Sequence, residues 1–504
     1  PRPQEEGLTL PERLNDVLDE RLRKEPEARC LWWKGAWGSR REFQSLADGC
    51  TRSLKDAGFG PGQRLAVMMP NSPMTEALAL AAWRLGGSFC PLNEKAGAAS
   101  LLKTLDLLRP FAVVVSEGVS GSLTEAIRGA GLSCALFPTE GTPPALTGRP
   151  TEPEAEALAV IFSTSGTTGD PKAVPITHAN LLDQCRGILE AIPTLSDKDS
   201  FLTVLPNFHA FGLTVSMLLP LYVGASQVVV PGFMPPQNTL RAIQEAHPSI
   251  LPLVPTMLNF ILALLERSGQ KAEGVRLLIA GGDRYNPQMD GRVKAAFGVG
   301  VLEGYGITEC SPVLAANRVE EGFRLGTVGR PLPRFELQLR TEAGAPTEAG
   351  EGVLWVRGPS VTAGYYHAPE LNRERFDHGW FNTGDYVRIE DGFVRILDRV
   401  TDILIVGGFN VYPQEVEKVL AGHPAVQTAI VVGIPHDING EVPKAYIQRK
   451  DGATVTEREL IRYAKEHLAH FKAPRSIEFV PSPGRARSSA ASCASGPERR
   501  ASDR

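Results

Sequence analysis

The chain has 504 residues, 42% hydrophobic and 22% charged, with a formal net charge of -4. This length predicts more than one folding unit, and the near-neutral charge excludes the basic footprint of a nucleic-acid-binding protein. The 7 cysteines are scattered without CxxC or Cys/His spacing, which argues against a disulfide framework or a zinc site and favours a reducing compartment.

Short apolar runs alternate with helical patterns between about residues 60 and 330. Such alternation predicts parallel sheets covered by helices. The predicted strand and helix pairs are Arg64–Met69 with Met74–Leu85, Ala112–Val115 with Gly121–Ala130, and Val275–Ile279 with Gln288–Phe297. The most apolar stretch, Leu213–Val230, contains Pro220 and Gly224, and therefore predicts a helix and a buried strand rather than a membrane span.

From Val328 to Ile396 the sequence consists of short glycine-rich segments with the pattern of β-strands, which predicts a smaller β subdomain. A compact unit follows, with predicted strands and helices at Ile403–Val406, Pro413–Ala421, Val426–Val432, Lys444–Arg449 and Glu457–His467. The predicted fold class is α/β. Residues 1–398 form a large domain of two parallel-type sheets plus the β subdomain, and residues 399–480 a small mobile α+β domain. Residues 481–504 have no apolar periodicity and are expected to be disordered.

A loop dense in glycine and hydroxyl side chains follows the apolar run Leu158–Phe162 and precedes a helix start at Thr177. Its sequence is Ser163-Thr164-Ser165-Gly166-Thr167-Thr168-Gly169-Asp170-Pro171-Lys172. Polyphosphate binding needs close backbone amides, hydroxyl donors and a cation, all of which this loop supplies. The loop lacks Walker A spacing, and we interpret it as a phosphate-binding loop between a strand and a helix.

This loop resembles the phosphate loop of the adenylate-forming superfamily, which includes acyl-CoA synthetases, luciferases and peptide-synthetase adenylation domains. The resemblance extends from about residue 10 to 480 and includes Pro70-Asn71-Ser72 and the run from Gly86-Gly87 to Pro91-Leu92-Asn93. It implies that ATP phosphates are bound by Ser163, Thr164, Ser165, Gly166, Thr167, Thr168 and Gly169. It further implies catalytic roles for Thr164 and Lys172, with Thr164 also a ligand of Mg²⁺.

The second motif is Gly304-Tyr305-Gly306-Ile307-Thr308-Glu309, directly after the apolar strand end Val301-Leu302. A hard cation that bridges phosphates needs oxygen ligands, which Glu309 can supply. The resemblance implies that Glu309 binds Mg²⁺, that Thr308 contacts phosphate, and that the Tyr305 ring stacks on adenine between Gly304 and Gly306. Cys310 follows directly and is interpreted as a buried spectator.

Two further segments are expected to line the substrate site. Gly281-Gly282-Asp283 follows the strand Leu277–Ala280, where open α/β sheets bind ligands, although Asp283 would equally suit a helix cap. His209 lies in Asn207-Phe208-His209-Ala210-Phe211-Gly212, a segment that resembles the family's substrate-carboxylate region. His209 would orient the acid or gate an acyl tunnel, and the alternative is a packed core histidine.

The remaining motifs lie towards the carboxyl end. Asp385 in Thr383-Gly384-Asp385 matches the family's ribose-binding aspartate, and Arg399 after Asp398 is implied as a second nucleotide contact. The loop Gly407-Gly408-Phe409 resembles the segment that lines the tunnel for the pantetheine arm of the acceptor.

The chain departs from the family pattern at two places. Thr401 stands where many relatives carry Asp or Lys at the hinge between domains. The family's late lysine, in a Pro-x-x-[Ser/Thr]-x-Gly-Lys type motif, has no counterpart, because Lys472 is the last lysine and Pro481–Ser488 reads PSPGRARS. An off-frame tail and a substituted tail are the two explanations. Either would impair the first half-reaction.

These observations indicate an ATP- and Mg²⁺-dependent acid–thiol ligase that forms an acyl-adenylate from a fatty, long-chain acid. An amine-binding Asp is lacking near Phe208–Leu213, the motifs look most like long-chain fatty acid ligases and bacterial acyl-carrier-protein synthetases, and Leu213–Leu221 is apolar enough to line a chain. CoA is the expected acceptor. An acyl carrier protein with its phosphopantetheine, or a catalytically impaired acyl- or nucleotide-binding protein, are the alternatives. We expect a cytoplasmic location, with peripheral membrane contact as an option and no nucleic-acid partner.

Overall fold

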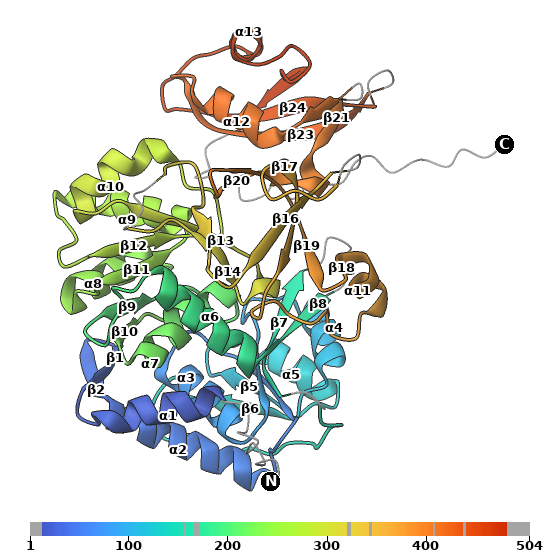
Figure 1. Ribbon diagram of the computed structural model, residues 1–504. Coiled ribbons are helices and arrows are strands. Elements are labelled where there is room, and N and C mark those ends of the chain that lie inside the picture. Colours follow the sequence, from blue (N-terminus) through green and yellow to red (C-terminus); the bar gives the residue numbers. More distant parts are fainter. Residues whose placement is uncertain are drawn as a thin grey trace, which may run out of the picture. The chain divides into compact units, whose positions relative to one another are not determined.

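The computed structural model describes residues 13–154, 157–165, 171–319, 324–341, 345–406, 409–436 and 440–480 (Figure 1). The chain divides into two compact units. Unit 1 is Pro1–Gln338, Trp355–Thr383 and Ile389–Arg395, and unit 2 is Leu339–Leu354, Gly384–Arg388 and Ile396–Arg504. The domain boundary after Asp398 remains a prediction.

One sheet of unit 1 has 6 strands in the order β6-β5-β3-β4-β7-β8. Its strands are β3 (Arg64–Met68), β4 (Ser88–Pro91), β5 (Ala112–Ser116), β6 (Cys134–Phe137), β7 (Leu158–Ser165) and β8 (Pro171–Thr177). All neighbours pair in parallel except β7 and β8. The strands β3 and β5 are buried along their whole length, as continuous apolar runs in parallel sheets usually are. The accompanying helices are α3 (Pro73–Arg84), α4 (Ala98–Leu108), α5 (Gly121–Gly129) and α6 (His178–Ala191).

The other large sheet of unit 1 has 9 strands in the order β15-β14-β13-β12-β11-β9-β10-β1-β2. The strands are β1 (Arg29–Trp33), β2 (Ala36–Ser39), β9 (Ser200–Thr203), β10 (Ser226–Val229), β11 (Ile250–Leu253), β12 (Leu277–Ala280), β13 (Val301–Gly306), β14 (Val313–Ala316) and β15 (Arg330–Pro331). The helices of this part are α1 (Leu14–Lys24), α2 (Arg40–Asp56), α8 (Pro236–Ala246), α9 (Pro255–Ser268), the short 3₁₀ turn η2 (Pro287–Met289) and α10 (Asp290–Phe297). The pairing from β1 through β13 is parallel, which confirms the predicted class.

The apolar stretch Leu213–Val230 forms a helix followed by the buried strand β10, as predicted. The helix begins as a π-helix, η1 (Gly212–Leu218), and continues as α7 (Leu219–Val223). Every residue of η1 is buried, and the wide π turn is a feature that the sequence pattern does not predict. Within the described part of the chain, no helix combines the length and the apolarity needed to cross a membrane.

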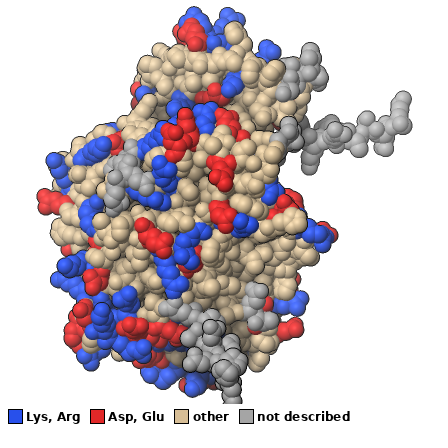
Figure 2. Space-filling model, in the orientation of Figure 1, with Lys and Arg blue, Asp and Glu red and all other residues tan. Residues whose placement is uncertain are grey.

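A five-stranded sheet contains β16 (Glu336–Arg340), β17 (Gly350–Arg357), β18 (Phe376–Asp377), β19 (Trp380–Glu390) and β20 (Phe393–Arg399), with α11 (Pro369–Arg375) and η4 (Val400–Asp402) nearby in sequence. These strands confirm the β-strands predicted between Val328 and Ile396. On the face shown in Figure 2, basic and acidic side chains are interspersed, in keeping with the near-neutral net charge.

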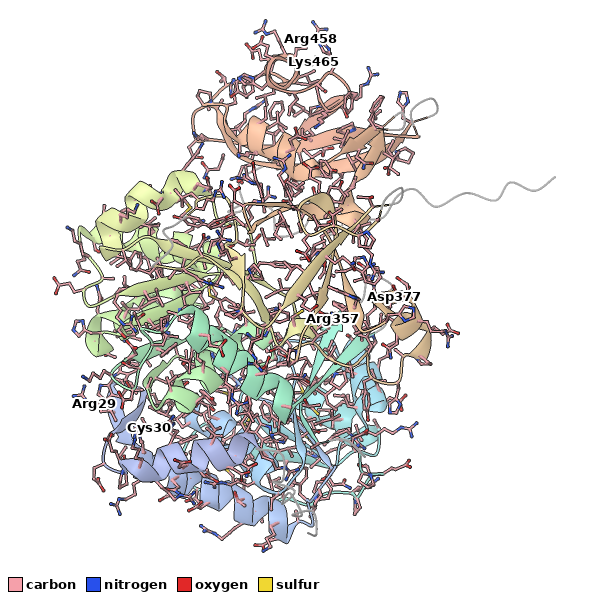
Figure 3. All side chains as sticks on the ribbon, in the orientation of Figure 1. Arg29, Cys30, Arg357, Asp377, Arg458 and Lys465 are labelled. Carbon is pink, nitrogen blue, oxygen red and sulfur yellow. The ribbon has the colours of Figure 1, made fainter. Side chains whose placement is uncertain are left out.

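The carboxyl part of unit 2 has its own five-stranded sheet. Its elements are β21 (Leu404–Val406), β22 (Phe409–Val411), α12 (Pro413–Ala421), β23 (Val426–His436), β24 (Gly440–Arg449), α13 (Glu457–His467) and β25 (Ser476–Phe479). The two helices match their predicted bounds. Helix α13 begins at a capping box formed by Thr456 and Glu459, and its Arg458 and Lys465 are exposed (Figure 3). The predicted disordered segment, 481–504, lies outside the described residues.

Glu76 on α3 is a buried carboxyl that faces the nine-stranded sheet. It is 2% exposed, its Oε2 accepts a hydrogen bond from Gln227 Nε2 at 3.0 Å, and its Oε1 has no partner among the described atoms. Burial raises the pKa of Glu76 to about 8, and the carboxyl also raises the pKa of the neighbouring Cys30 thiol, although burial is the larger cause there. Glu76 is therefore protonated in the folded protein at neutral pH.

This arrangement predicts that stability falls as pH rises from about 5 to 8. Below this window both folded and unfolded chains are protonated at Glu76, whereas within it only the unfolded chain ionises. As the pH rises from about 5 to 8, the unfolding free energy of the wild type should fall by roughly 4 kcal/mol relative to that of the Glu76→Gln variant. Chemical denaturation at several pH values measures this. The matched control is Glu125→Gln at an exposed position on α5, and an equal pH slope in wild type and Glu76→Gln would contradict the prediction.

Candidate functional site

The two sides of the predicted phosphate loop form an antiparallel pair. Strand β7 pairs with β8 so that Thr164 lies opposite Lys172 and Ser163 opposite Ala173. The Thr164 hydroxyl donates to the Lys172 carbonyl at 3.5 Å. The tip of the loop, with Gly166, Thr167, Thr168 and Gly169, lies outside the described residues, and only the backbone of Ser165 is described.

The loop was predicted to lie between a strand and a helix start at Thr177, and the structure places a further strand, which was not predicted, between the loop and the helix. A strand, β8, comes between the loop and α6, because Ala173, Val174 and Ile176 bury themselves in the sheet edge beside β7. The helix start itself is as predicted. Thr177 is the N-cap of α6 and forms a capping box with Asn180.

The turn that carries Glu309 lies next to β8. Strand β13 ends at Gly306 and is followed by the 3₁₀ turn η3 (Thr308–Cys310), which packs against β8. A Cβ at Gly306 would lie 2.0 Å from the Pro312 carbonyl oxygen, so only glycine allows this close approach. Cys310 is fully buried, as expected for a spectator. The fold thus brings Thr164, Lys172, Thr308 and Glu309 into one region from segments distant in sequence.

Residues 358–366, here called the bridging segment, tie this turn to β8. The Thr362 amide donates to the Glu309 carbonyl at 2.8 Å, and the Tyr366 amide donates to the Ala173 carbonyl at 2.8 Å. The Thr362 hydroxyl also donates to the Pro175 carbonyl at 2.6 Å. These bonds hold the strand of Lys172 and the turn of Glu309 in a fixed relation.

The side chain of Glu309 is held by a tyrosine that sequence reasoning missed. The Tyr365 hydroxyl donates to Glu309 Oε1 at 2.7 Å, and Tyr365 is 7% exposed. Burial, followed by the charge of Glu309, raises the pKa of Tyr365, so the hydroxyl remains a donor at all physiological pH values. In the sequence this tyrosine is marked only by the doublet Tyr365-Tyr366, which does not indicate a hydrogen-bond partner for either hydroxyl.

An apolar cavity of unit 1 opens beside this region. Its walls combine the end of α6, the π-helix, strand β14, the glycine turn after β12 and the glycine-containing end of β13. The lining residues are Ile188, Ile192, Leu195, His209, Phe211, Val215, Leu219, Ile279, Ala280, Gly281, Gly282, Gly304, Tyr305, Gly306, Ile307, Thr308, Pro312, Val313, Ala316 and Leu332. The contribution of Val215 and Leu219 agrees with the predicted apolar lining from Leu213–Leu221. The walls from α6 were not predicted.

His209 is one of the few polar residues that line this cavity. Its Nδ1 accepts a hydrogen bond from the Phe211 amide at 3.3 Å, which places the proton of the neutral ring on Nε2. Desolvation by the surrounding protein lowers the pKa of His209, so the ring is neutral near pH 7, even though part of the residue is exposed. A neutral imidazole with a free N–H edge can donate to a carboxylate. The residue is exposed and lines the cavity, and the choice between a substrate role and a packing role stays a prediction.

The glycine turn after β12 is also at the cavity, but its aspartate is not. Gly281 and Gly282 line the wall, and Gly282 has φ of +78°, a conformation that favours glycine. Asp283 is exposed and accepts a hydrogen bond from the Arg284 amide at 2.7 Å. The helix-cap alternative for Asp283 was wrong, since the following turn η2 has Asn286 at its N-cap.

Unit 2 holds the residues predicted to contact ribose and the acceptor. Asp385 is 3% exposed at its side chain and forms an ion pair with Arg399 at 3.0 Å. Asp398 accepts from the Gln414 amide at 3.3 Å near the start of α12, which suits a carboxylate at a helix N-terminus. Phe409 is 60% exposed and lies 4.9 Å from the Phe471 ring. Gly407 and Gly408 lie outside the described residues.

The described residues contain no group of three or more His, Cys, Asp or Glu side chains that could cage a metal ion. Among the described residues, the candidate oxygen ligands of this region are the carboxylate of Glu309 and the hydroxyls of Thr164 and Thr308. This set fits Mg²⁺, which is usually bound through one or two carboxylates together with the phosphates of a substrate.

Comparison with known proteins agrees with this geometry. The family model described as AMP-binding enzyme matches residues 18–366, and the AMP-binding enzyme C-terminal domain matches residues 415–489. A feruloyl-CoA synthase from Amycolatopsis sp is 31% identical over 91% of this chain and 93% of its own, and a long-chain-fatty-acid–CoA ligase from Bacillus subtilis is 29% identical over 94% and 92%.

A solved structure gives the same result for the fold. The crystal structure of ATP-bound MatB from Rhodopseudomonas palustris has a TM-score of 0.82 at 29% identity and covers 93% of this chain and 95% of its own. The chain therefore belongs to the AMP-binding enzyme family of adenylate-forming ligases, which join a carboxylic acid to the thiol of CoA with release of AMP.

Proposed function

We propose that this chain activates a fatty acid to an acyl-adenylate and then transfers the acyl group to CoA. The observation that carries the proposal is the apolar cavity beside the Thr308–Glu309 turn, with the His209 ring and Thr308 among its few polar groups. A carboxylate at this polar end, with the adjoining part of a hydrocarbon body in the cavity of about 70 Å³, would suit the carboxyl end of a fatty acid.

In the first half-reaction, a carboxylate oxygen of the acid attacks the α-phosphorus of ATP. The bond between that phosphorus and the bridging oxygen breaks, and pyrophosphate leaves with the electron pair. Lys172 is the cation on the loop strand, and the hydroxyl of Thr308 is assigned as a donor to the phosphate oxygens. Fixed donors and cations of this kind stabilise the charge that develops on the phosphates.

Glu309 and Thr164 are the residues that would hold Mg²⁺. When bound, this ion neutralises phosphate charge and orients the pyrophosphate leaving group. Tyr305, between Gly304 and Gly306, is assigned to the adenine ring. Asp385 is assigned to the ribose hydroxyls, with Arg399 as its neighbour.

In the second half-reaction, the acceptor thiol gives its proton to solvent and attacks the acyl carbonyl carbon. The carbon–oxygen bond to phosphate breaks, and AMP leaves. Phe409, with Gly407 and Gly408, is assigned to the passage of the pantetheine arm. An acyl carrier protein presents the same arm, and it remains the alternative acceptor.

The lining of the cavity favours a single-carboxylate acid with an apolar body. Among the described residues that line it, none is Asp, Glu, Lys or Arg, and the wall residues far from the glycine turns are Ile, Leu and Val. A second charge on the acid would therefore lie buried without a partner, which is strongly unfavourable. An aromatic acid is the second candidate, because a feruloyl-CoA synthase is among the relatives.

Pyrophosphate release with a panel of acids tests the substrate proposal. Saturated fatty acids should be activated faster than ferulate. An α,ω-dicarboxylic acid should be at least about 100-fold slower than the monocarboxylic acid of equal length, since an unpaired buried carboxylate costs at least about 3 kcal/mol. The same panel with CoA and with a carrier protein identifies the acceptor. Preference for ferulate or for the diacid would overturn the fatty-acid assignment.

His209 should affect the acid more than the nucleotide. His209→Ala should lower kcat/KM for the acid by roughly 10- to 100-fold, because one hydrogen bond to a charged group contributes about 1.5–3 kcal/mol. The KM for ATP should change little. His178→Ala is the matched control, as His178 accepts the Leu14 amide at 3.3 Å inside the fold. It should lower Tm without changing acid kinetics. A His209 variant that loses only Tm would restore the core-histidine interpretation.

A separate prediction concerns the rate of acyl-adenylate formation, because the sequence has no lysine after Lys472. The chain should form acyl-adenylate about 100- to 1000-fold more slowly than a variant with Arg485→Lys, because the planar guanidinium of an arginine does not place a compact charge against the transition state as a lysine ammonium does. Both forms should pass a supplied acyl-adenylate to CoA at similar rates. Lys472→Ala is the control. In the described structure Lys472 is paired with Glu415 at 2.6 Å, and a large loss in that variant would show that Lys472 supplies the charge.

A further inference from the structure

Tyr365 is fixed on every side in the position from which it contacts Glu309. Its amide donates to Asn372 Oδ1 at 2.6 Å, and its carbonyl accepts from Asn372 Nδ2 at 3.0 Å, so one side chain of α11 clamps its backbone. Its ring lies 6.4 Å from Phe376, edge-on, and 6.4 Å from Phe381. The phenol therefore reaches Glu309 from an aromatic cluster, and the backbone that carries it is hydrogen-bonded to Asn372.

The bond from Tyr365 determines how Glu309 can be used. The hydroxyl occupies Oε1 at 2.7 Å, and the backbone carbonyl of Glu309 is occupied by the Thr362 amide at 2.8 Å. Rotation of the carboxylate would break the bond to the tyrosine. The hydroxyl thus fixes the plane of the carboxylate and leaves Oε2 as its other oxygen for a cation.

We propose that Tyr365 is the positioning residue that presents Glu309 to the Mg²⁺ of the nucleotide complex. The proposal rests on the assignment of Glu309 under the proposed function. Partners that orient a metal ligand typically contribute 10- to 100-fold in metal affinity, and Tyr365 has the donor atom, the burial and the rigid support for that role.

The next residue provides a matched control. Tyr366 is also buried, at 9% exposure, and its hydroxyl also donates to a glutamate, Glu154. Glu154 is paired at 2.8 Å with Arg64, whose guanidinium binds backbone carbonyls around β3. Loss of the Tyr366 hydroxyl therefore removes the same chemistry from a structural network without touching Glu309.

The test uses the full chain, Mn²⁺ as the probe in place of Mg²⁺, and α,β-methylene-ATP, which cannot form the adenylate. Free Mn²⁺ is measured by electron paramagnetic resonance in wild type, Tyr365→Phe, Tyr366→Phe and Glu309→Gln. Tyr365→Phe should weaken Mn²⁺ binding in the nucleotide complex by about 10- to 100-fold, while affinity for the metal-free nucleotide stays unchanged. Tyr366→Phe should bind Mn²⁺ like the wild type, whatever its Tm.

Two further measurements keep the proposal testable if Tyr365→Phe is poorly folded. Asn372→Ala leaves the hydroxyl and the rings in place but removes the backbone clamp, and it should weaken Mn²⁺ binding by a smaller factor. In the Glu309→Gln background, Tyr365→Phe should have no further effect, because both act at one point.

The outcomes separate this proposal from the function on which it rests. If Glu309→Gln loses Mn²⁺ affinity but Tyr365→Phe and Asn372→Ala do not, Tyr365 is not a positioning residue and the assignment of Glu309 stands. If Glu309→Gln itself binds Mn²⁺ like the wild type, Glu309 is not the metal ligand and both statements fall. If Tyr366→Phe weakens Mn²⁺ binding as much as Tyr365→Phe, the effect is a general loss of packing and the proposal is overturned.

Discussion

The hydrogen bonds of the bridging segment, residues 358–366, are the constraint on which the arrangement of unit 1 depends. They connect the edge strand β8, which carries Lys172, to the turn that carries Glu309. Lys172 lies on the edge strand of the six-stranded sheet, and Glu309 lies on the turn that follows β13 of the nine-stranded sheet. The hydrogen bonds within each sheet do not fix the position of one residue relative to the other. The backbone hydrogen bonds of the bridging segment fix that position, because buried amides and carbonyls must be paired and the pairing is directional. These bonds fix the relative position of the two segments to which the proposed phosphate and Mg²⁺ contacts are assigned.

The same region combines polar and apolar surfaces, as the proposed site for a nucleotide and a fatty acid requires. The polar atoms gather where strands end and glycines remove side chains, at Gly281–Gly282 and Gly304–Gly306, whereas the apolar walls come from α6 and the π-helix. Strand ends of parallel sheets offer unpaired backbone groups to a nucleotide, and helix faces offer side chains to a hydrocarbon. The wide π turn displaces Val215 from an ordinary helical position, which shapes the wall, and such turns are frequent at functional sites.

The sequence by itself determined the class of the fold and most of the chemistry. Strands such as Arg64–Met68 and helices such as Pro413–Ala421 are encoded locally, because continuous apolar runs, and amphipathic segments that begin with proline, allow few other structures. The glycine- and hydroxyl-rich loop, Glu309 and His209 could be singled out for the same reason, since each combines residue types that only certain ligands require. Family membership followed from these motifs, and the comparisons confirm it.

Contacts between distant segments were decided only by the tertiary structure. Tyr365 and Tyr366 are adjacent in sequence, but their hydroxyls donate to different glutamates. Tyr365 contacts Glu309, 56 residues away in sequence, and Tyr366 contacts Glu154, 212 residues away, and only the folded structure shows these pairs. The strand β8 was missed because its burial depends on pairing with β7. Ile188 and Ile192 read as an ordinary apolar helix face, and the cavity that they line is formed jointly with elements far along the chain. Periodicity reports which face of a segment is buried, but the partner of that face is a property of the whole fold.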